Sequence, residues 1–234
     1  MKAFVDLHCH TSASFDSLAA PGAVVHAAAG RGITHLAITD HDRIDGALAA
    51  RAAAPEGLTV IVGEEIRTSD GDLIALFLER AIAPGRSARD TIAEVRAQGG
   101  LVGIPHPFDR WRGSMMRDVR LEGTAQLADW IEAHNARVVA GTGNERAAAL
   151  ARELGLPGVA VSDAHSVLEV GVAYTIVEGD PSTPAGLLAA LGTIVEVVPG
   201  RASYLVRALT PVAKLVNRAR GNRRRASTPA GPVP

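Results

Sequence analysis

Residues 33–46, ITHLAITDHDRIDG, decide the fold, because an apolar strand runs directly into a polar cluster and then toward a helix. The run ITHLAIT predicts a strand over residues 33–39, and Asp40, His41 and Asp42 follow it at once. The Ala-rich stretch that comes next predicts a helix over residues 45–54. The same order of strand, polar residues and helix recurs along the chain. This alternation predicts parallel strands joined by helical crossovers, which is the α/β class.

The number of repeating units favours a closed, TIM-like barrel over a two-layer sandwich. The expected strands cover residues 3–8, 33–39, 58–63, 72–78, 101–104, 137–140, 158–162, 172–177 and 193–198. The expected helices cover residues 21–31, 45–54, 87–98, 124–134, 145–154, 184–191 and 203–220. Pro211 is expected to kink or interrupt the last of them. We expect one barrel domain over residues 1–200, a basic amphipathic helix over residues 201–220, and a disordered basic, Pro-rich tail over residues 221–234.

The formal charge of −1 conceals two parts of opposite sign. Residues 1–200 hold 16 basic and 25 acidic residues, a charge of −9, whereas residues 201–234 hold eight basic residues and no acidic ones. Aromatic residues make up only 3% of the chain, which argues against a nucleic-acid platform of stacked rings. The single cysteine excludes a disulfide framework. With no signal peptide and no apolar run of about 20 residues, we expect a cytoplasmic protein without a transmembrane segment.

Six polar clusters lie at or beside the ends of the expected strands. They contain Asp6, His8, His10 and Asp16; Asp40, His41 and Asp42; Glu64 and Glu65; His106; Glu132 and His134; and Asp163 and His165. In a parallel barrel the C-terminal strand ends share one rim, where active sites are built. The six clusters are therefore expected to converge.

The spacing within the clusters indicates metal binding. Side chains two positions apart on a strand face the same way, so His8 and His10 can bind one centre while Cys9 points away. Asp163 and His165 repeat this spacing. Imidazole mixed with carboxylate suits Zn, Mn or Fe, whereas Mg and Ca prefer mostly oxygen ligands. Because the candidates exceed one tetrahedral site, we expect two or three metals, bridged by a carboxylate such as that of Glu65.

Simpler interpretations apply to several residues taken singly. His26 and His35 stand outside the clusters and are expected to be structural. Asp42, Glu64 and Glu132 fit solvated charges or helix caps as well as site residues. The combination of H-x-H, D-H-D and D-x-H after separate strands is the feature that chance does not readily produce.

The clusters resemble the motifs of the PHP (polymerase and histidinol phosphatase) family of metal-dependent phosphoesterases. The similar segments are DLHCHTSASFDS (6–17), ITHLAITDHDRIDG (33–46), IVGEEI (61–66), GIPHPF (103–108), IEAHNAR (131–137) and SDAHSVLEVG (162–171). The resemblance implies a distorted (β/α)7 barrel with two or three divalent metals, Mn, Fe or Zn. It implies hydrolysis of a phosphate ester by a metal-bound hydroxide.

Carried over motif by motif, the resemblance implies roles for individual residues. His8, His10 and Asp163 are implied ligands of a first metal, Glu65 a bridging carboxylate and His106 a ligand of a second metal. Asp16, His41 and His165 are implied ligands of a third metal, and His134 a further ligand. Asp40 is implied to orient a histidine ligand.

The catalytic and substrate roles follow from the same motifs. His41 or His165 is expected to protonate the leaving oxygen when it is not held as a ligand. Arg43, Arg110 and Arg112 lie nearest the motifs and are expected to bind the substrate phosphate. The expected substrate is a small phosphorylated metabolite or a short nucleotide.

Three alternatives stay open from the sequence. The domain could bind metals in a regulatory or structural role, or it could hydrolyse C–N bonds as amidohydrolases do. Residues 201–225 could make weak contacts with anionic lipid or nucleic acid, or the last helix could simply pack on the barrel.

Overall fold

The computed structural model describes residues 1–109, 114, 122–138 and 141–224. Its strands are β1 (Lys2–Asp6), β2 (His35–Ile38), β3 (Thr59–Arg67), β4 (Asp72–Leu76), β5 (Leu101–Ile104), β6 (Trp130–Asn135), β7 (Gly158–Val161), β8 (Tyr174–Glu178) and β9 (Ile194–Val198). Its helices are α1 (Pro21–Gly30), α2 (Asp45–Ala52), α3 (Ala88–Ala97), α4 (Glu122–Ala125), α5 (Gly143–Leu154), α6 (Pro184–Leu191), α7 (Tyr204–Arg207) and α8 (Leu209–Ala219).

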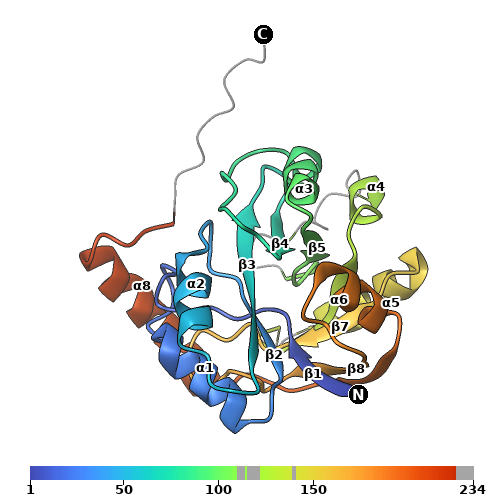
Figure 1. The fold of residues 1–234 in the computed structure, drawn as a ribbon. Helices are drawn as coiled ribbons and strands as arrows, with labels where there is room; N and C mark the ends of the chain where they lie inside the picture. The colour runs from blue at the N-terminus through green and yellow to red at the C-terminus, as the bar shows by residue number, and fades with distance from the viewer. Residues whose placement is uncertain (110–113, 115–121, 139–140, 225–234) are drawn as a thin grey trace.

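The strands form one sheet in the order β7-β6-β5-β4-β3-β2-β1-β8-β9, with helices packed around it (Figure 1). The pairs β1–β2, β2–β3, β5–β6 and β6–β7 are parallel. The pairs β3–β4, β4–β5, β1–β8 and β8–β9 are antiparallel. The turn between β3 and β4 is too short for the dozen or more residues that a parallel crossover needs, so these strands form a hairpin. The α/β barrel-like fold predicted from the sequence is confirmed, with a mixed rather than wholly parallel sheet.

The barrel is nearly closed by chain segments that run past the ends of β1 and β7. Cys9 and Ala164 form an isolated parallel bridge. The backbone N–H of Asp163 donates to the carbonyl of His8, and that of His10 donates to the carbonyl of Ala164, each over 2.9 Å. The two segments richest in predicted ligands are thus hydrogen-bonded to each other.

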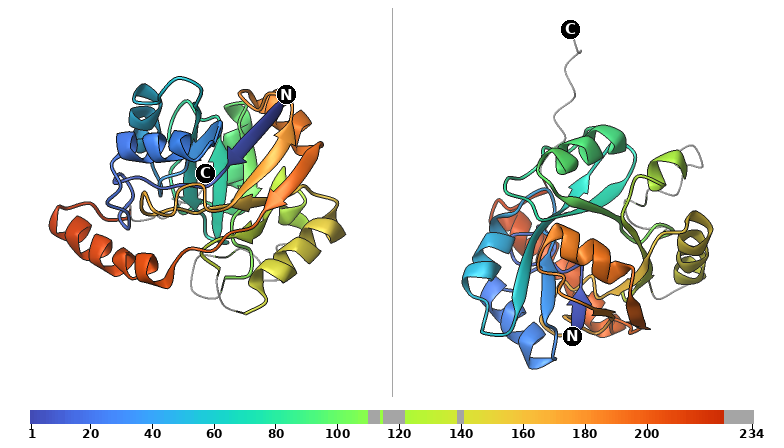
Figure 2. Two further views of the ribbon diagram at one scale, coloured as in Figure 1. Left: turned by 90° about the horizontal axis from the view of Figure 1, so that it is seen from below. Right: turned by 45° about the vertical axis from the view of Figure 1, so that its right-hand side comes forward.

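Alternate residues of the strands fill the barrel interior with apolar side chains. Val5, Ile61 and Trp130 belong to this inner core, and Leu187 and Leu191 of α6 pack against it. Figure 2 shows α6 lying across the sheet at the end where the chain begins. The inner core therefore supports the opposite rim, where the polar clusters lie.

The segment from residue 122 to 140 differs from the sequence prediction. A helix was expected over residues 124–134 and a strand over 137–140, but α4 is only four residues long and β6 begins at Trp130. Trp130 and Ile131 are fully buried between β5 and β7, so pairing on both edges of the strand outweighs local helix propensity. Residues 139–140 lie outside the described residues.

The C-terminal region is helical, and its helix is interrupted as Pro211 predicts. The helix expected over residues 203–220 is divided into α7 and α8. Pro211 has no N–H, and its ring would clash with the carbonyl of Arg207, which explains the break. Residues 221–224 of the expected disordered tail are described and contact the barrel, as shown below. None of the described helices is long and apolar enough to cross a membrane.

Candidate metal centre

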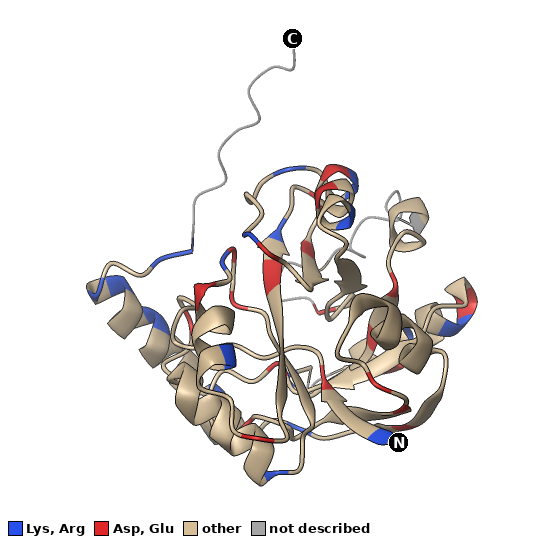
Figure 3. Cartoon of the chain, viewed as in Figure 1, with Lys and Arg blue, Asp and Glu red and all other residues tan. Residues whose placement is uncertain are grey.

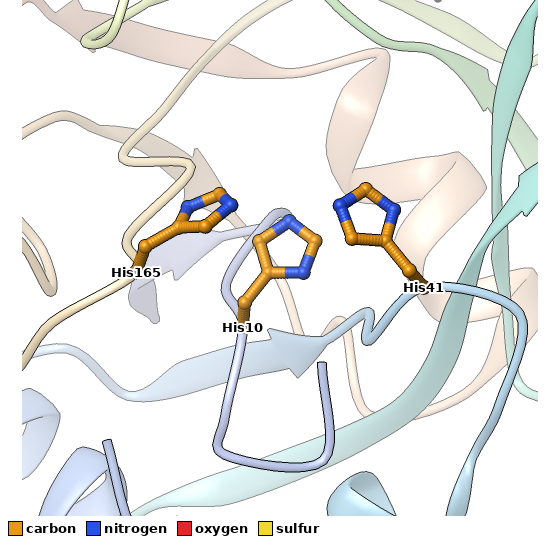
Figure 4. A group of neighbouring side chains, drawn as sticks. All are labelled: His10, His41 and His165. Atoms are coloured by element: carbon orange, nitrogen blue, oxygen red, sulfur yellow. The ribbon is translucent and has the colours of Figure 1, made fainter. Parts of the chain in front are cut away.

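Three histidines meet at the rim where β1, β2 and β7 end. His10, His41 and His165 come from three separate segments and point toward one another (Figure 4). The ring centroid of His10 lies 4.7 Å from that of His41 and 4.2 Å from that of His165. One ring nitrogen of each lies within 4.8 Å of the others. The barrel rim thus brings together histidines that are up to 155 residues apart in the sequence.

Glu65 on β3 lies at the centre of the histidines. The Nε2 atoms of His8 and His10 are 2.9 Å apart, and each lies 3.2 Å from Oε2 of Glu65. The same oxygen is 3.3 Å from Nδ1 of His41, whereas Oε1 is 3.3 Å from Nε2 of His106. The two carboxylate oxygens of Glu65 therefore face different histidines, as a bridging ligand requires.

Two aspartates complete the group. Oδ1 of Asp163 lies 3.6 Å from Nε2 of both histidines that follow β1, and 3.5 Å from Nδ1 of His165. Oδ2 of Asp16 lies 3.5 Å from Nε2 of His41 and 3.4 Å from Nε2 of His165. Eight of the nine predicted ligands are thus brought together: His8, His10, Asp16, His41, Glu65, His106, Asp163 and His165.

The spacing of these atoms fits divalent ions. Two ligand atoms that each lie about 2.1 Å from one ion stand roughly 3.0–3.4 Å apart in octahedral or tetrahedral geometry. The closest nitrogen–oxygen pairs around Glu65 are 3.2 Å apart. Oδ1 of Asp16 is buried and accepts no hydrogen bond from the described residues, which leaves a lone pair for an ion. The mixture of imidazole and carboxylate favours Zn, Mn or Fe.

The ionisation of the side chains also suits cations. Burial acts to raise the pKa of Glu65, but the nearby rings of His41 and His8 hold that pKa well below its usual range. Burial opposes charge on His8, yet the Glu132 carboxylate and its neighbours raise the pKa of His8 well above its usual range. In the same way, carboxylates raise the pKa of His10 to about 9. Ions entering the site must therefore displace protons from these two rings.

Asp40 holds His10 through an intermediate hydroxyl rather than by direct contact. Asp40 accepts hydrogen bonds from the backbone N–H of Thr11 at 2.7 Å and from the hydroxyl of Ser14 at 2.8 Å. The Ser14 hydroxyl lies 3.0 Å from Nδ1 of His10. A side chain on Gly46 would overlap Asp40 and Thr11, so this network requires glycine there. Asp40 is thus placed to orient a histidine, in keeping with its predicted role.

Glu132 is a site residue that sequence reasoning did not select. Its Oε1 lies 2.6 Å from Nδ1 of His8. Its Oε2 accepts hydrogen bonds from the backbone N–H of His106 and from the Asn135 amide, both over 2.8 Å. The Asn135 amide also donates to Asp163 over 3.0 Å. A carboxylate on the far nitrogen of a histidine fixes its orientation and raises its basicity as a ligand.

His134 is the one predicted ligand that the structure does not bring to the centre. Its Nε2 lies 2.7 Å from the carbonyl of Gly200, and its Nδ1 lies 3.3 Å from the Asn144 amide. The register of β6 shifts between Glu132 and His134, so that Glu132 and Asn135 face the centre instead. Regular alternation would place Glu132 and His134 on the same face, so the local sequence carries no signal for this difference.

Backbone strain is concentrated at the same rim. Asp42, His106 and Asp163 have positive φ angles of 56°, 28° and 50°. Non-glycine residues adopt this region at a cost, and they do so most often where surrounding contacts fix a functional site. Asp42 illustrates such a contact, because its Oδ1 accepts a 2.8 Å hydrogen bond from the backbone of Arg67.

Of the three arginines predicted to bind phosphate, only Arg43 lies among the described residues, and its hydrogen bonds are made with residues outside the metal centre. Arg110 and Arg112 lie outside the described residues. Arg43 is paired with the Asp45 carboxylate through Nε at 2.6 Å, and it also donates to the Asn222 side chain at 3.2 Å. Its guanidinium is therefore used mainly in local contacts.

Two other arginines pair with acids that lie beside predicted ligands, since Glu169 accepts a hydrogen bond from the backbone of His165 and Asp42 follows His41. Nη1 of Arg137 is 3.5 Å from Glu169, and its Nη2 donates to the Thr210 hydroxyl at 2.7 Å. Burial, reinforced by the charge of Arg137, lowers the pKa of His165 to about 3. His165 therefore stays neutral, as a metal ligand must be.

Arg224 belongs to the basic C-terminal region, and its partners are buried acids of the barrel. Its Nε donates to Asp42 at 3.1 Å and its Nη2 to Asp72 at 2.8 Å. Sequence reasoning treated this charge as part of a solvated tail, because a partner 182 residues away leaves no local pattern. Part of the basic charge of the C-terminal region is thus compensated by the acidic body.

Helix α8 and the residues after it fasten the loop that carries Asp16. The Asn217 amide donates to the carbonyls of Ser14 and Ser17, over 3.2 and 2.8 Å. The Asn222 amide donates to carbonyls of the same loop. Lys and Arg residues lie at intervals along α8 (Figure 3). Contact of residues 201–225 with anionic lipid or nucleic acid stays a prediction.

The residues set aside as structural lie away from the centre or face away from it. Cys9 is fully buried in the apolar layer outside the barrel, as strand alternation predicts. His26 is exposed on α1, and His35 contacts the Ser182 hydroxyl at 3.0 Å. Glu64 accepts a hydrogen bond from the backbone of Ile82, whereas Glu65 faces the histidines.

Comparison with known proteins gives matches along most of the chain. The family model described as the PHP domain matches residues 6–144, and the one described as PHP-associated matches residues 141–193. An uncharacterized protein of Methanocaldococcus jannaschii is 36% identical over 137 residues, which cover 53% of this chain and 79% of the relative.

Solved structures have the same fold at low sequence identity. A two-domain protein from Bacteroides vulgatus, described as containing a predicted PHP-like metal-dependent phosphoesterase, is 20% identical with a TM-score of 0.67. The match covers 82% of this chain and 62% of that one. A lesion-specific endonuclease from Pyrococcus furiosus is 17% identical with a TM-score of 0.64, covering 83% of this chain and 58% of that one.

Proposed function

Because this chain belongs to the PHP-domain family of metal-dependent phosphoesterases, we propose that it hydrolyses phosphate esters at the centre around Glu65. The observation that carries the proposal is the position of that carboxylate. Its two oxygens face the histidines after β1 on one side and His106 on the other, each within 3.3 Å. A shared carboxylate of this kind holds ions close together, the arrangement used for hydrolytic phosphoryl transfer.

The residues divide into three groups of ligands. His8, His10 and Asp163 would hold a first ion, His106 would hold a second, and Glu65 would join the two. Divalent ions at such a centre supply a nucleophile from water near neutral pH and stabilise charge on the phosphoryl oxygens. Glu132 keeps His8 in the tautomer that presents Nε2 to the centre.

The third group is Asp16, His41 and His165, and its role depends on the number of ions. With three ions bound, all three side chains would be ligands. With two ions, the His41 ring could donate a proton to the leaving oxygen, and the Asp16 carboxylate, 3.5 Å from its Nε2, would orient that ring. The number of ions per chain therefore separates the two roles.

The proposed substrate is a phosphate monoester or diester of a small metabolite or a short nucleotide. The similarity of fold to an endonuclease supports the nucleotide class. The His and carboxylate ligands support Mn, Fe or Zn as the ions. Binding of the phosphate by Arg110 and Arg112 remains a prediction from the sequence.

The test is release of phosphate, or of the organic product, from a panel of esters by protein loaded in turn with Mn, Fe, Zn or Co. The panel should contain phosphomonoesters, short oligonucleotides and cyclic amides, with Glu65→Gln as the inactive control. Hydrolysis of an ester that depends on both the ion and Glu65 is expected. Cleavage of amides alone would favour C–N hydrolysis, and no turnover with any ion would favour a regulatory or structural metal domain.

A further inference from the structure

A cavity of about 350 Å³ opens directly beside the metal centre. Asp16 and His165, which belong to the centre, are among the residues that line it. The lining also includes residues before and at the start of α1, together with Val206 and the first half of α8. The cavity is therefore continuous with the place where a substrate phosphate would be hydrolysed.

The walls of this cavity are mainly aliphatic. Leu18, Leu209 and Val212 line it and are 42%, 51% and 52% exposed, although they are apolar. Exposed apolar side chains around a concave surface are typical of ligand sites. The start of α8 thus presents apolar side chains to a space that the described residues do not fill.

Most polar groups of the cavity already have partners within the protein, and the exception is Oδ1 of Asp16, which accepts no hydrogen bond from the described residues and belongs to the metal centre. The Thr210 hydroxyl accepts a hydrogen bond from Arg137, and Glu169 accepts one from the Ser166 hydroxyl at 3.0 Å. The described residues that line the cavity include carboxylates but no Lys or Arg. An anionic group would therefore be repelled here, whereas an uncharged apolar group could be buried against the aliphatic walls without breaking these hydrogen bonds.

We propose that this cavity binds an uncharged apolar group of the substrate, attached to the phosphate through the ester oxygen. The inference rests on the proposed function, because it places the phosphate at the metal centre and the organic group between α1 and α8. Aryl and alkyl groups share the chemistry that the walls recognise. The cavity would make the enzyme selective for esters with a bulky apolar group over those with a small one.

The test compares ethyl, hexyl and 2-phenylethyl phosphate with the metal-loaded full chain. All three leave as primary alkoxides, so differences in kcat/KM report binding of the organic group rather than leaving-group basicity. Because burial of several methylene groups is involved, kcat/KM should be at least about tenfold higher for one or both larger esters than for ethyl phosphate. The hexyl and phenylethyl results distinguish an alkyl from an aryl preference.

Variants on the two faces of α8 provide the matched control. Val212→Asn, in the cavity wall, should lower the hexyl-to-ethyl or phenylethyl-to-ethyl ratio several-fold. Leu215→Asn, at a site on the same helix that is 70% exposed and outside the cavity lining, should leave the ratio unchanged. A ratio near one in the wild type, or equal ratios in the wild type and Val212→Asn, would overturn the inference.

A binding measurement separates this inference from the proposed function. Calorimetric titration of the metal-loaded chain with ethyl-, hexyl- and 2-phenylethylphosphonate requires no turnover. Tighter binding of a larger phosphonate, abolished in Val212→Asn, would support the cavity even if no ester were hydrolysed. If all esters were hydrolysed and all phosphonates bound with equal affinity, the inferred role of the cavity would be refuted and the proposed phosphoesterase function would still stand.

Discussion

The substitution Glu132→Gln tests whether an outer carboxylate tunes the metal centre. Glu132 is 1% exposed, and its Oε1 lies 2.6 Å from Nδ1 of His8, the ring nitrogen that faces away from Glu65. Glutamine keeps the size of the side chain and can still accept hydrogen bonds, but it removes the charge that makes His8 a strong ligand. Loss of such a partner costs about 10–100-fold in metal affinity, or roughly 1.4–2.7 kcal/mol.

The affinity should be measured by competition with a chromophoric chelator, using Mn and Zn in turn. Thermal unfolding of the metal-free protein should be recorded alongside, because replacing a charged hydrogen-bond acceptor costs about 1–2 kcal/mol of stability. Glu153→Gln, on the exposed face of α5, is the matched control and should change neither quantity. A change of less than threefold in affinity for both ions would refute the assigned role of Glu132.

Three further changes test other parts of the site. Gly46→Ala should disrupt the Asp40 network and weaken metal binding at least tenfold in a chelator assay. Gly30→Ala, whose methyl group meets nothing within 4 Å, should leave the metal affinity unchanged. Equal metal affinities in the two variants would contradict the role of the Asp40 network. Arg224→Met should lower the free energy of unfolding in urea by about 3 kcal/mol, because it leaves the buried carboxylates of Asp42 and Asp72 without a counter-charge. Arg223→Met, at an exposed site, is the control, and an equal loss of unfolding free energy in both variants would count against the pairing. Because the pKa of His10 is raised to about 9, its proton should stabilise the metal-free protein fully below about pH 6.5 and progressively less as pH rises through 9. Metal affinity should rise over the same interval. If neither the free energy of unfolding nor the metal affinity changed with pH, the raised pKa of His10 would be contradicted.

The sequence was sufficient to select most of the residues that meet at the rim, because each of them lies in a local motif. H-x-H after β1 and D-x-H after β7 could be assigned from strand alternation alone, and the barrel then brought the motifs together. The carboxylate of Glu65 and the direction of Cys9 follow from the same rule. The barrel-like fold could likewise be predicted from the alternation of strands and helices.

The remainder of the site depends on contacts between distant residues. Trp130 and Ile131 form a strand because β5 and β7 pair with both of its edges, which a helix-compatible local sequence does not indicate. The register shift in β6 then brings in Glu132 and leaves His134 outside. The pairing of Arg224 with Asp42 spans nearly the whole chain and has no sequence signature. These are tertiary effects that override local pattern.

The most direct test of the metal centre is anomalous diffraction from crystals of the protein grown with Mn²⁺. At least two anomalous peaks are expected within bonding distance of the predicted ligands, with Glu65 bound to both. Loss of at least one peak is expected in Glu65→Gln. A single peak, or peaks that do not involve Glu65, would contradict a shared multi-metal centre.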